Sequence, residues 1–177
     1  VNSWKRDIAV KKILKSKNVI WKQFENQAVI RALKNRDGWD KNWYVYANSP
    51  IINNKFSLND FHLNKTKFDF SIEQLPFLKK YPEKFQPAGE DYAIKYLKSF
   101  LHNRAENYNY NISSPEKSRY SCSRLSPYLS WGNISVRCVY QNVKNHYNFK
   151  NYKRSFSSFL SRLKWRSHFI QKFEVDN

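Results

Sequence analysis

The sequence predicts a mainly α-helical chain in three parts: the end of an α/β domain at residues 1–50, an inter-domain connection at 51–88 and part of an all-helical domain at 89–177. Two observations lead to this division. A helical pattern followed by a short strand pattern opens the chain, and a helix followed by a strand is half of an α/β repeat. Apolar residues recur at helical spacing from Gly89 onward, whereas the residues between these regions have no sustained periodicity.

The first part is expected to contain four elements. Residues 4–16 predict a helix with a narrow apolar stripe, and residues 18–24 predict a short strand. Residues 28–35 predict a turn or a short helix. A second helix over 39–47 stops before Pro50, which cannot continue it. The chain has no methionine, so we expect it to be a piece of a longer protein whose first domain begins upstream.

The middle of the chain predicts a linker. Asn, Lys, Phe and Pro alternate over residues 50–88, and Pro76, Pro82 and Pro87 interrupt any regular element. A connection of this length is unusual inside one compact domain. We therefore expect a segment that runs over the surface and marks a domain boundary.

The third part opens with a helix after Gly89, and a polar stretch over 107–122 is expected to be a loop. Ser135 caps a helix whose apolar residues recur at helical spacing. Residues 155–171 predict the last helix. Its expected core stripe is Phe156, Leu160, Leu163 and Ile170, and its opposite side carries Ser158, Arg162, Trp165 and Phe169.

The charge of the chain bears on its partners. It carries 32 Lys and Arg against 14 Asp and Glu, a formal net charge of +18. Such a charge favours a polyanionic partner, either nucleic acid or an anionic membrane surface. The codon bias of an AT-rich genome, which enriches Lys, Asn, Ile and Tyr, would explain it equally well. Aromatic residues make up 18% of the chain and are either core or surfaces on which bases or other planar rings stack.

Residue spacing excludes several kinds of site. The three glycines are too far apart to form a dinucleotide fingerprint. Cys122 and Cys138 form neither a CxxC motif nor a zinc pattern, so free thiols in a reducing compartment are expected. The four histidines have no metal-ligand spacing. No apolar run approaches the ~20 residues that span a bilayer, so no membrane-spanning segment is expected. Of the two polyanionic partners we expect nucleic acid and no membrane.

The segment YSCSRLSPYLSWG at 120–132 gathers groups suited to an anion. Three serine hydroxyls and Arg124 come directly before or within the start of a short helix. Ser126 is its expected N-cap, Pro127 its first helical residue and Gly132 its end. A helix N-terminus offers free N–H groups and the positive end of the dipole. The combination suits a diphosphate or another anion, and an ordinary serine-rich cap is the alternative.

The stretch SCSRLSPYLSWGNIS resembles the (T/S)SRLSPYL-x-x-G-x-(I/L)-S signature of the photolyase/cryptochrome family. GEDYAIKYLKSFL resembles the family's helix leading into the flavin domain, and NRDGWDKNWYVYANSPI resembles the end of its N-terminal domain in a bacterial branch. FLSRLKWRSHF occupies the place of its substrate-facing helix. The resemblance implies that residues 1–50 end a Rossmann-like α/β antenna domain and that 89–177 form the first half of an all-helical FAD-binding domain.

The resemblance also implies roles for single residues. Trp165 matches the Trp that stacks on a flipped-out pyrimidine dimer, and Arg162 stands where the family has an acidic or amide residue near the lesion. An arginine is always charged and cannot donate a proton there, so it would bind a phosphate or an anionic radical. The positions implied to contact FAD are Tyr110, Cys122, Ser123, Arg124, Leu125, Ser126, Phe159 and Arg166.

The activity that the resemblance implies is light-driven, FAD-dependent repair of pyrimidine dimers in damaged DNA, by an enzyme of the deoxyribodipyrimidine photo-lyase type. A cryptochrome-like blue-light photoreceptor that binds FAD without repair is the alternative. Arg162 favours the photoreceptor, whereas the positive charge favours the enzyme. A basic helical nucleic-acid binder without flavin is a third hypothesis. Both lesion types, the cyclobutane dimer and the 6-4 product, stay open.

Further expectations follow from the resemblance. Ser3 replaces a Glu with which some members hold a folate, while Asn2 is kept, so a folate or deazaflavin antenna chromophore stays open. Lys117 or Arg119 would replace an arginine that some members place on DNA phosphate. A monomer in a bacterial cytoplasm is implied. The other half of the family's helical domain supplies contacts to the flavin ring, so we expect weak or no flavin binding by this chain alone.

Overall fold

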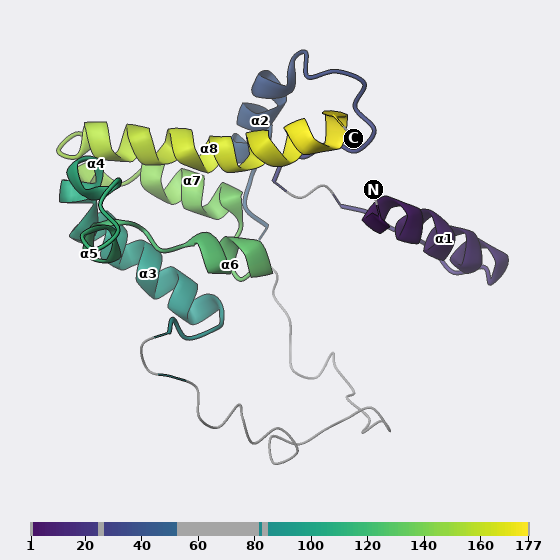
Figure 1. The fold of residues 1–177 in the computed structure, drawn as a ribbon, viewed down its shortest axis with the longest axis horizontal. Helices are drawn as coiled ribbons and strands as arrows, with labels where there is room; N and C mark the ends of the chain where they lie inside the picture. The colour runs from purple at the N-terminus through teal and green to yellow at the C-terminus, as the bar shows by residue number, and fades with distance from the viewer. Residues whose placement is uncertain (1, 25–26, 53–81, 83–84, 177) are drawn as a thin grey trace.

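The computed structural model describes residues 2–24, 27–52, 82 and 85–176, apart from the side chains of residues 2, 3 and 176. All regular elements in these residues are helical, which confirms the mainly helical prediction (Figure 1). In chain order they are α1 (Asn2–Ser16), α2 (Trp39–Asn48), α3 (Glu90–His102), η4 (Arg104–Asn107), α4 (Tyr108–Asn111), α5 (Ser118–Ser121), α6 (Ser126–Trp131), α7 (Val136–Lys144), η5 (Tyr147–Phe149) and α8 (Lys153–Asp176).

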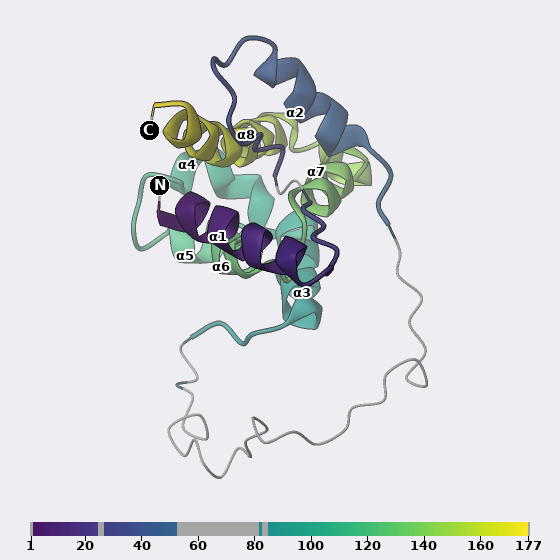
Figure 2. The ribbon, with the colours of Figure 1, turned by 90° about the vertical axis from the view of Figure 1, so that its right-hand side faces the viewer.

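The longest helix, α8, packs against several of the shorter ones. It contacts α7, α4, η4 and η5, and α7 in turn contacts α2, which lies far away in the sequence. In Figures 1 and 2, α2 and α8 lie at the top of the helical body and α3 lies at its lower edge. In Figure 1, α1 projects away from the body to one side. The body is thus a bundle of short helices organised along α8.

An apolar core forms because the helices turn their apolar residues inward at helical spacing. On α3 these residues include Ala93, Leu97 and Phe100, each at most 3% exposed. The Phe100 ring lies 6.1 Å from that of Phe156 and 4.8 Å from that of Phe159, both on α8. Aromatic pairs at such distances contribute roughly 0.5–1.5 kcal/mol each beyond the burial of their surface. The contact fixes α3 against α8.

Polar side chains of α7 and α8 hold the N-terminal segments by binding their backbone. Gln141 of α7 donates to the carbonyl oxygens of Ala47 and Ser49 at 2.9 and 2.7 Å, at the C-terminal end of α2, where carbonyls lack helical partners. Gln171 of α8 is fully buried. It accepts from the N–H of Ile30 at 2.7 Å and donates to the carbonyl of Ile30 at 3.0 Å. These bonds attach Ile30 and the end of α2, from the first part of the chain, to α7 and α8.

Six predicted helices and two predicted caps are confirmed. The Ser135 hydroxyl accepts from the N–H of Cys138 at 3.0 Å and so caps α7. Gly132 ends α6 with a φ of 76°, in the left-handed region that glycine adopts without strain. The confirmed helices are those at 4–16, 39–47 and 155–171, the helix after Gly89 (α3), the short helix that Gly132 ends (α6) and the helix that Ser135 caps (α7). Turns are present in the segment 28–35.

The strand predicted at 18–24 is wrong. The described part of the chain contains no strand, so residues 18–24 have no partner with which to form a ladder of hydrogen bonds. Its apolar side chains stay exposed, with Ile20 at 81% and Phe24 at 84%. These residues therefore do not show the end of an α/β domain. Of the linker predicted at 51–88, residues 53–81 and 83–84 lie outside the described residues.

The loop predicted at 107–122 is also wrong, because α4 and α5 form within it. Both are single-turn helices that contact η4, and α4 also contacts α8. Helices this short are unstable alone, so their formation depends on tertiary packing that local sequence patterns do not reveal.

The core stripe predicted on α8 is correct at its start and wrong at its end. Phe156 and Leu163 are buried, and Leu160 is partly buried. Ile170 is instead 39% exposed, while Ser167 and Gln171 are fully buried. Four-residue steps from Leu163 reach positions 167 and 171, so the inward face continues through polar residues that a search for apolar periodicity passes over.

Candidate functional site

The turn at 122–126, which carries the signature serines, joins α5 to α6 in a specific backbone conformation. Cys122 is extended, with φ −82° and ψ 157°, whereas Arg124 has a left-handed φ of 56°. A non-glycine residue in that region costs of order 1–3 kcal/mol, so the surroundings must hold it there. Leu125 provides one anchor, since its side chain is 1% exposed in the core.

Arg104 of η4 provides a second anchor for the turn. Its guanidinium donates to the carbonyl oxygens of Cys122 and Ser123, the latter at 3.3 Å. It also donates to the carbonyl of Tyr96 at 2.7 Å and to the hydroxyl of Ser99 at 3.0 Å, both on α3. Burial lowers the pKa of Arg104 from its ordinary value, yet arginine remains charged at neutral pH. One half-buried cation thus ties the turn to α3.

Gln86 holds the turn from the side of the chain that precedes α3. Its amide donates to the carbonyl of Arg124 at 2.8 Å and accepts from Arg124 Nε at 3.1 Å. Nearby, the Tyr128 hydroxyl of α6 donates to the carbonyl of Pro87 at 2.7 Å. These reciprocal bonds account for the left-handed conformation of Arg124 and fix the direction of its side chain.

The hydroxyls of the motif differ in their access to a ligand. Ser121 is 5% exposed and accepts from the Asn111 amide at 2.7 Å. Ser123 is 8% exposed, and its hydroxyl lies 3.4 Å from the N–H of Leu125. Ser126 is exposed at the first position of α6 and makes no side-chain cap there, so the predicted N-cap is wrong. Ser126 therefore presents the accessible hydroxyl of the predicted set.

The outer side of α8 carries the residues expected to meet a lesion. Trp165 is 51% exposed and Phe169 is 61% exposed. Arg162 is exposed as well, and its guanidinium carbon lies 5.8 Å from the centre of the Trp165 ring. A cation at that distance is attracted to the face of the ring. The pair forms an exposed surface that combines a planar ring with a positive charge.

The pKa of the Cys122 thiol depends on charges both around the turn and on α8. Burial raises the pKa of the Cys122 thiol, and the positive charges of Arg104, Arg162 and Arg124 partly offset that rise. Two of these arginines belong to the turn and its anchor, and Arg162 belongs to α8. The charge of Arg162 on α8 thus acts on the Cys122 position in the turn.

Arg166 forms a second link between α8 and the motif. Its guanidinium donates to the hydroxyl of Ser130 on α6 at 3.3 Å, and burial lowers its pKa. The other two predicted FAD contacts lie elsewhere. Phe159 is 6% exposed within the core, 5.9 Å from the ring of Tyr108, and Tyr110 is 77% exposed on α4.

A cavity of about 790 Å³ opens beside Arg124, on the side of the turn that faces α3. We call it the basic hollow. Two predicted site residues line it: Arg124, and Arg119, which was expected to contact DNA phosphate in place of a family arginine. The other lining residues were missed, although a run of residues at i, i+3, i+4 and i+7 on the predicted α3 helix could have indicated them. Its lining is Tyr92, Lys95, Tyr96 and Ser99 of α3, Arg104, Arg119, Tyr120 and Arg124.

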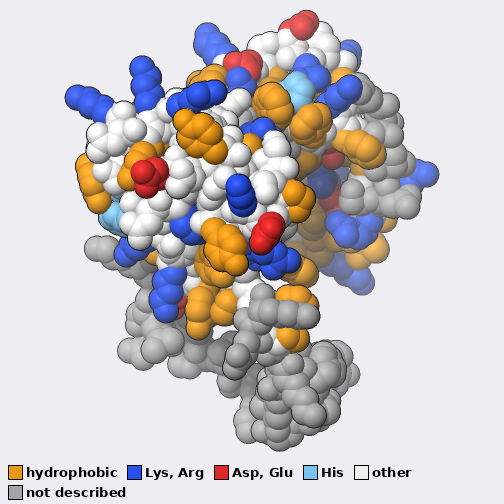
Figure 3. All heavy atoms as spheres, turned by 60° about the vertical axis from the view of Figure 1, so that its left-hand side comes forward, with side chains coloured by type: hydrophobic (Ala, Val, Ile, Leu, Met, Phe, Trp, Pro, Cys, Tyr) orange, Lys and Arg blue, Asp and Glu red, His pale blue; other side chains and the backbone are white. Residues whose placement is uncertain are grey.

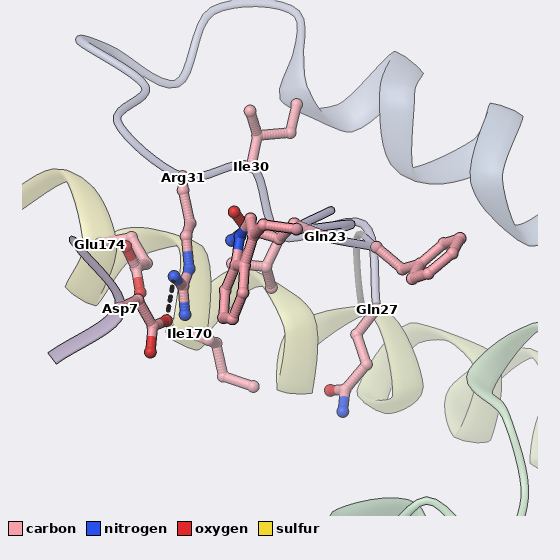
Figure 4. Close-up of a pocket in the computed structure, with 10 residues that line it drawn as sticks. Asp7, Gln23, Gln27, Ile30, Arg31, Ile170 and Glu174 are labelled. Atoms are coloured by element: carbon pink, nitrogen blue, oxygen red, sulfur yellow. Dashed lines mark hydrogen bonds and ion pairs between the residues drawn. The ribbon is translucent and has the colours of Figure 1, made fainter. Parts of the chain in front are cut away.

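A second cavity, of about 560 Å³, lies between the segment 21–31 and the end of α8 (Figure 4). Asp7 and Arg31 form an ion pair at its edge, 2.5 Å apart, and this contact connects α1 to the body. The guanidinium of Arg31 and then that of Arg6 lower the pKa of Asp7. Sequence reasoning did not identify this cavity. The side chains of Asn2 and Ser3, where a folate contact was considered, lie outside the described residues.

Two kinds of feature are absent from the part of the chain that the structure describes. None of its helices combines the length and the apolar character needed to cross a membrane. Its His, Cys, Asp and Glu side chains form no group of three that could hold a metal ion.

Comparison with known proteins gives one informative match. The "Deoxyribodipyrimidine photo-lyase" of Alkalihalophilus pseudofirmus is 34% identical over 101 residues, which are 56% of this chain and 20% of that protein. The chain therefore spans about a fifth of the length of this relative. No family model matches the sequence, and no solved structure matches it. The chain is thus similar to a photolyase over more than half of its own length.

Proposed function

We propose that this chain belongs to a photolyase-like protein that uses FAD and light to repair pyrimidine dimers in damaged DNA. One observation carries the proposal: Arg166 of α8, next to Trp165 in the sequence, donates a hydrogen bond to Ser130 of the signature segment, 36 residues earlier in the chain. The relative named a photo-lyase and the resemblance of residues 121–135 to the family signature support it. The reaction class would be that of a carbon–carbon lyase.

The residues around the turn fit the phosphate part of FAD. Ser126 presents an exposed hydroxyl, and Arg124 supplies a guanidinium whose direction Gln86 fixes. Charged and hydroxyl donors held in place are what a diphosphate requires. When bound, the reduced flavin would supply the electron that splits the dimer. Phe159 would act through the core, since it is buried there, rather than on the flavin itself.

The outer side of α8 would receive the lesion. Trp165 is sufficiently exposed to stack on a base that has left the duplex, which costs a few kcal/mol and less when the pair is damaged. Arg162 would place its charge beside that base and attract a phosphate or an anionic radical. The net charge of +18 would supply further phosphate contacts, which position the DNA without reading its sequence.

A second candidate function rests on Arg162. The family's acidic or amide residue is replaced here by a permanent cation next to Trp165. This favours a cryptochrome-like photoreceptor that binds FAD without repairing DNA. In either case we place the protein in the cytoplasm as a monomer, with its two free thiols in a reducing compartment. Either function is compatible with an antenna chromophore of the folate or deazaflavin type.

The test is a repair assay on two oligonucleotides, one with a cyclobutane dimer and one with a 6-4 product, under blue light, with the whole gene product that carries this sequence. Repair is expected, and Trp165→Ala is expected to weaken binding of the damaged strand by roughly 5- to 150-fold, because stacking of one base contributes about 1–3 kcal/mol. Trp4→Ala removes the same side chain from α1 and is the control. Absence of repair despite bound FAD would eliminate the enzyme and leave the photoreceptor.

A further inference from the structure

The basic hollow shares no lining residue with the outer side of α8. Tyr92, Lys95, Tyr96 and Ser99 occupy one side of α3. The inward side of the same helix, which carries Ala93, Leu97 and Leu101, is buried in the core. Successive residues of a helix are rotated by 100°, so these two sides point in clearly different directions. The hollow therefore lies on the side of α3 that faces away from the core, and neither Arg162 nor Trp165 lines it.

The charge of the hollow is entirely positive. Lys95, Arg104, Arg119 and Arg124 line it, and no carboxylate is among its lining residues. Arg104 uses its donors on the turn and on α3, so its role is mainly structural while its charge remains. Lys95 and Arg119 are exposed. Four cations that surround one depression without acidic partners attract a polyanion more strongly than scattered surface lysines do. Figure 3 shows one face of the molecule, on which Lys and Arg side chains clearly outnumber acidic ones.

Tyrosine rings alternate with these cations. Tyr120 of α5 is 74% exposed and Tyr92 of α3 is 40% exposed. The Lys95 ammonium lies 4.9 Å from the centre of the Tyr92 ring, and the Arg104 guanidinium lies 5.6 Å from that of Tyr96. An exposed aromatic ring offers a surface on which a base can stack, and a cation beside the ring offers a contact for a phosphate. The rings and charges thus form a repeated pattern rather than a single pocket for one group.

We propose that the basic hollow binds single-stranded nucleic acid. Lys95 and Arg119 contact successive phosphates, the rings of Tyr92 and Tyr120 stack on bases, and Arg104 and Arg124 add positive charge to the lining. Two exposed rings and several cations exceed what one nucleotide, with one base and one phosphate, can use. A duplex cannot offer its bases to these rings, because they are paired and stacked inside it. The proposal does not depend on the proposed function, since Lys95, Arg119, Tyr92 and Tyr120 are not among the residues proposed to hold FAD or to stack on the lesion.

The experiment measures binding of the 177-residue chain to a fluorescein-labelled oligothymidylate by anisotropy at several salt concentrations. The double variant Lys95→Ala/Arg119→Ala is compared with Lys5→Ala/Lys12→Ala, which removes the same charge from exposed positions on α1. The first variant is expected to bind more than tenfold more weakly, and its salt slope to fall by about 1.4, since each lost phosphate contact contributes about 0.7 for single strands. Equal losses in both variants would show that only net charge matters and would overturn the proposal.

A second variant tests stacking. Tyr120→Ala is expected to weaken binding of oligothymidylate by roughly 5- to 150-fold and to leave binding of an abasic strand of equal length unchanged. An equal effect on both strands would contradict the role of the ring. Duplex DNA that binds as tightly as the single strand, or thymidine monophosphate that binds as tightly as the oligomer, would also overturn the proposal. The exposed positions chosen should leave the circular dichroism spectrum unchanged, which confirms that each variant is folded.

Discussion

Replacing Arg104 by alanine should destabilise the whole helical body, although Arg104 is not an apolar core residue. Its guanidinium is the donor to the carbonyls of Cys122 and Ser123 in the turn. Hydrogen bonds to charged groups contribute about 1.5–3 kcal/mol each, and partial exposure places these two near the lower limit. The expected loss is therefore about 2–4 kcal/mol of the free energy of unfolding. For a chain of this length that corresponds to roughly 5–15 °C in Tm.

Urea unfolding followed by far-ultraviolet circular dichroism measures this loss. Arg104→Lys keeps the charge but loses the planar fork, so it should fall between the wild type and Arg104→Ala. Arg154→Ala, at an exposed position of α8, is the matched control and should change the stability by less than about 0.5 kcal/mol. If Arg104→Ala costs no more than Arg154→Ala, Arg104 does not anchor the turn, and another group must hold Arg124 in its left-handed conformation.

Two further predictions concern buried groups. Gln171→Leu should cost about 2–4 kcal/mol, because both backbone groups of Ile30 lose their partner, and hydrogen exchange at the Ile30 amide should accelerate; an unchanged exchange rate would contradict it. In a Cys138→Ser variant, burial raises the pKa of Cys122, so alkylation should reach half its maximal rate at a higher pH than in the urea-unfolded chain. Because the pKa of this thiol is higher in the folded than in the unfolded chain, its contribution to the free energy of unfolding is fully present below the unfolded pKa of about 8.5. The contribution is lost as the pH rises through the folded pKa. Equal alkylation profiles would show that Cys122 is not buried.

The helices were predictable wherever apolar spacing and end signals agreed. Gly132 ended α6 and Ser135 capped α7 as their residue types require. The strand at 18–24 could not be judged from its own residues, because a strand exists only with a partner. The single-turn helices α4 and α5 were missed for a related reason, since contacts with η4 stabilise them rather than any local pattern.

The candidate site was predictable in its sequence position but not in its chemistry. The serines of the motif suggested three hydroxyl donors, yet Ser121 and Ser123 are buried and engaged inside the protein. Their burial follows from packing against α4 and the core, which no spacing rule reveals. Arg104 was not identified at all, because its importance comes from reaching across to a turn that follows much later in the chain.

The turn at 122–126 borders both the proposed FAD site and the basic hollow, and its rigidity favours ligand binding at each. Arg104 and Gln86 bind its carbonyls from the side of α3, so the backbone cannot relax when a ligand approaches. Arg124, held in a strained conformation, directs its charge toward the hollow, while Ser126 opens α6 on the other side of Leu125. A site whose donors are fixed in advance loses less entropy on binding. If the turn were mobile, both surfaces would weaken together, and Arg104→Ala should therefore reduce strand binding at the hollow even though Arg104 itself uses its hydrogen bonds within the protein.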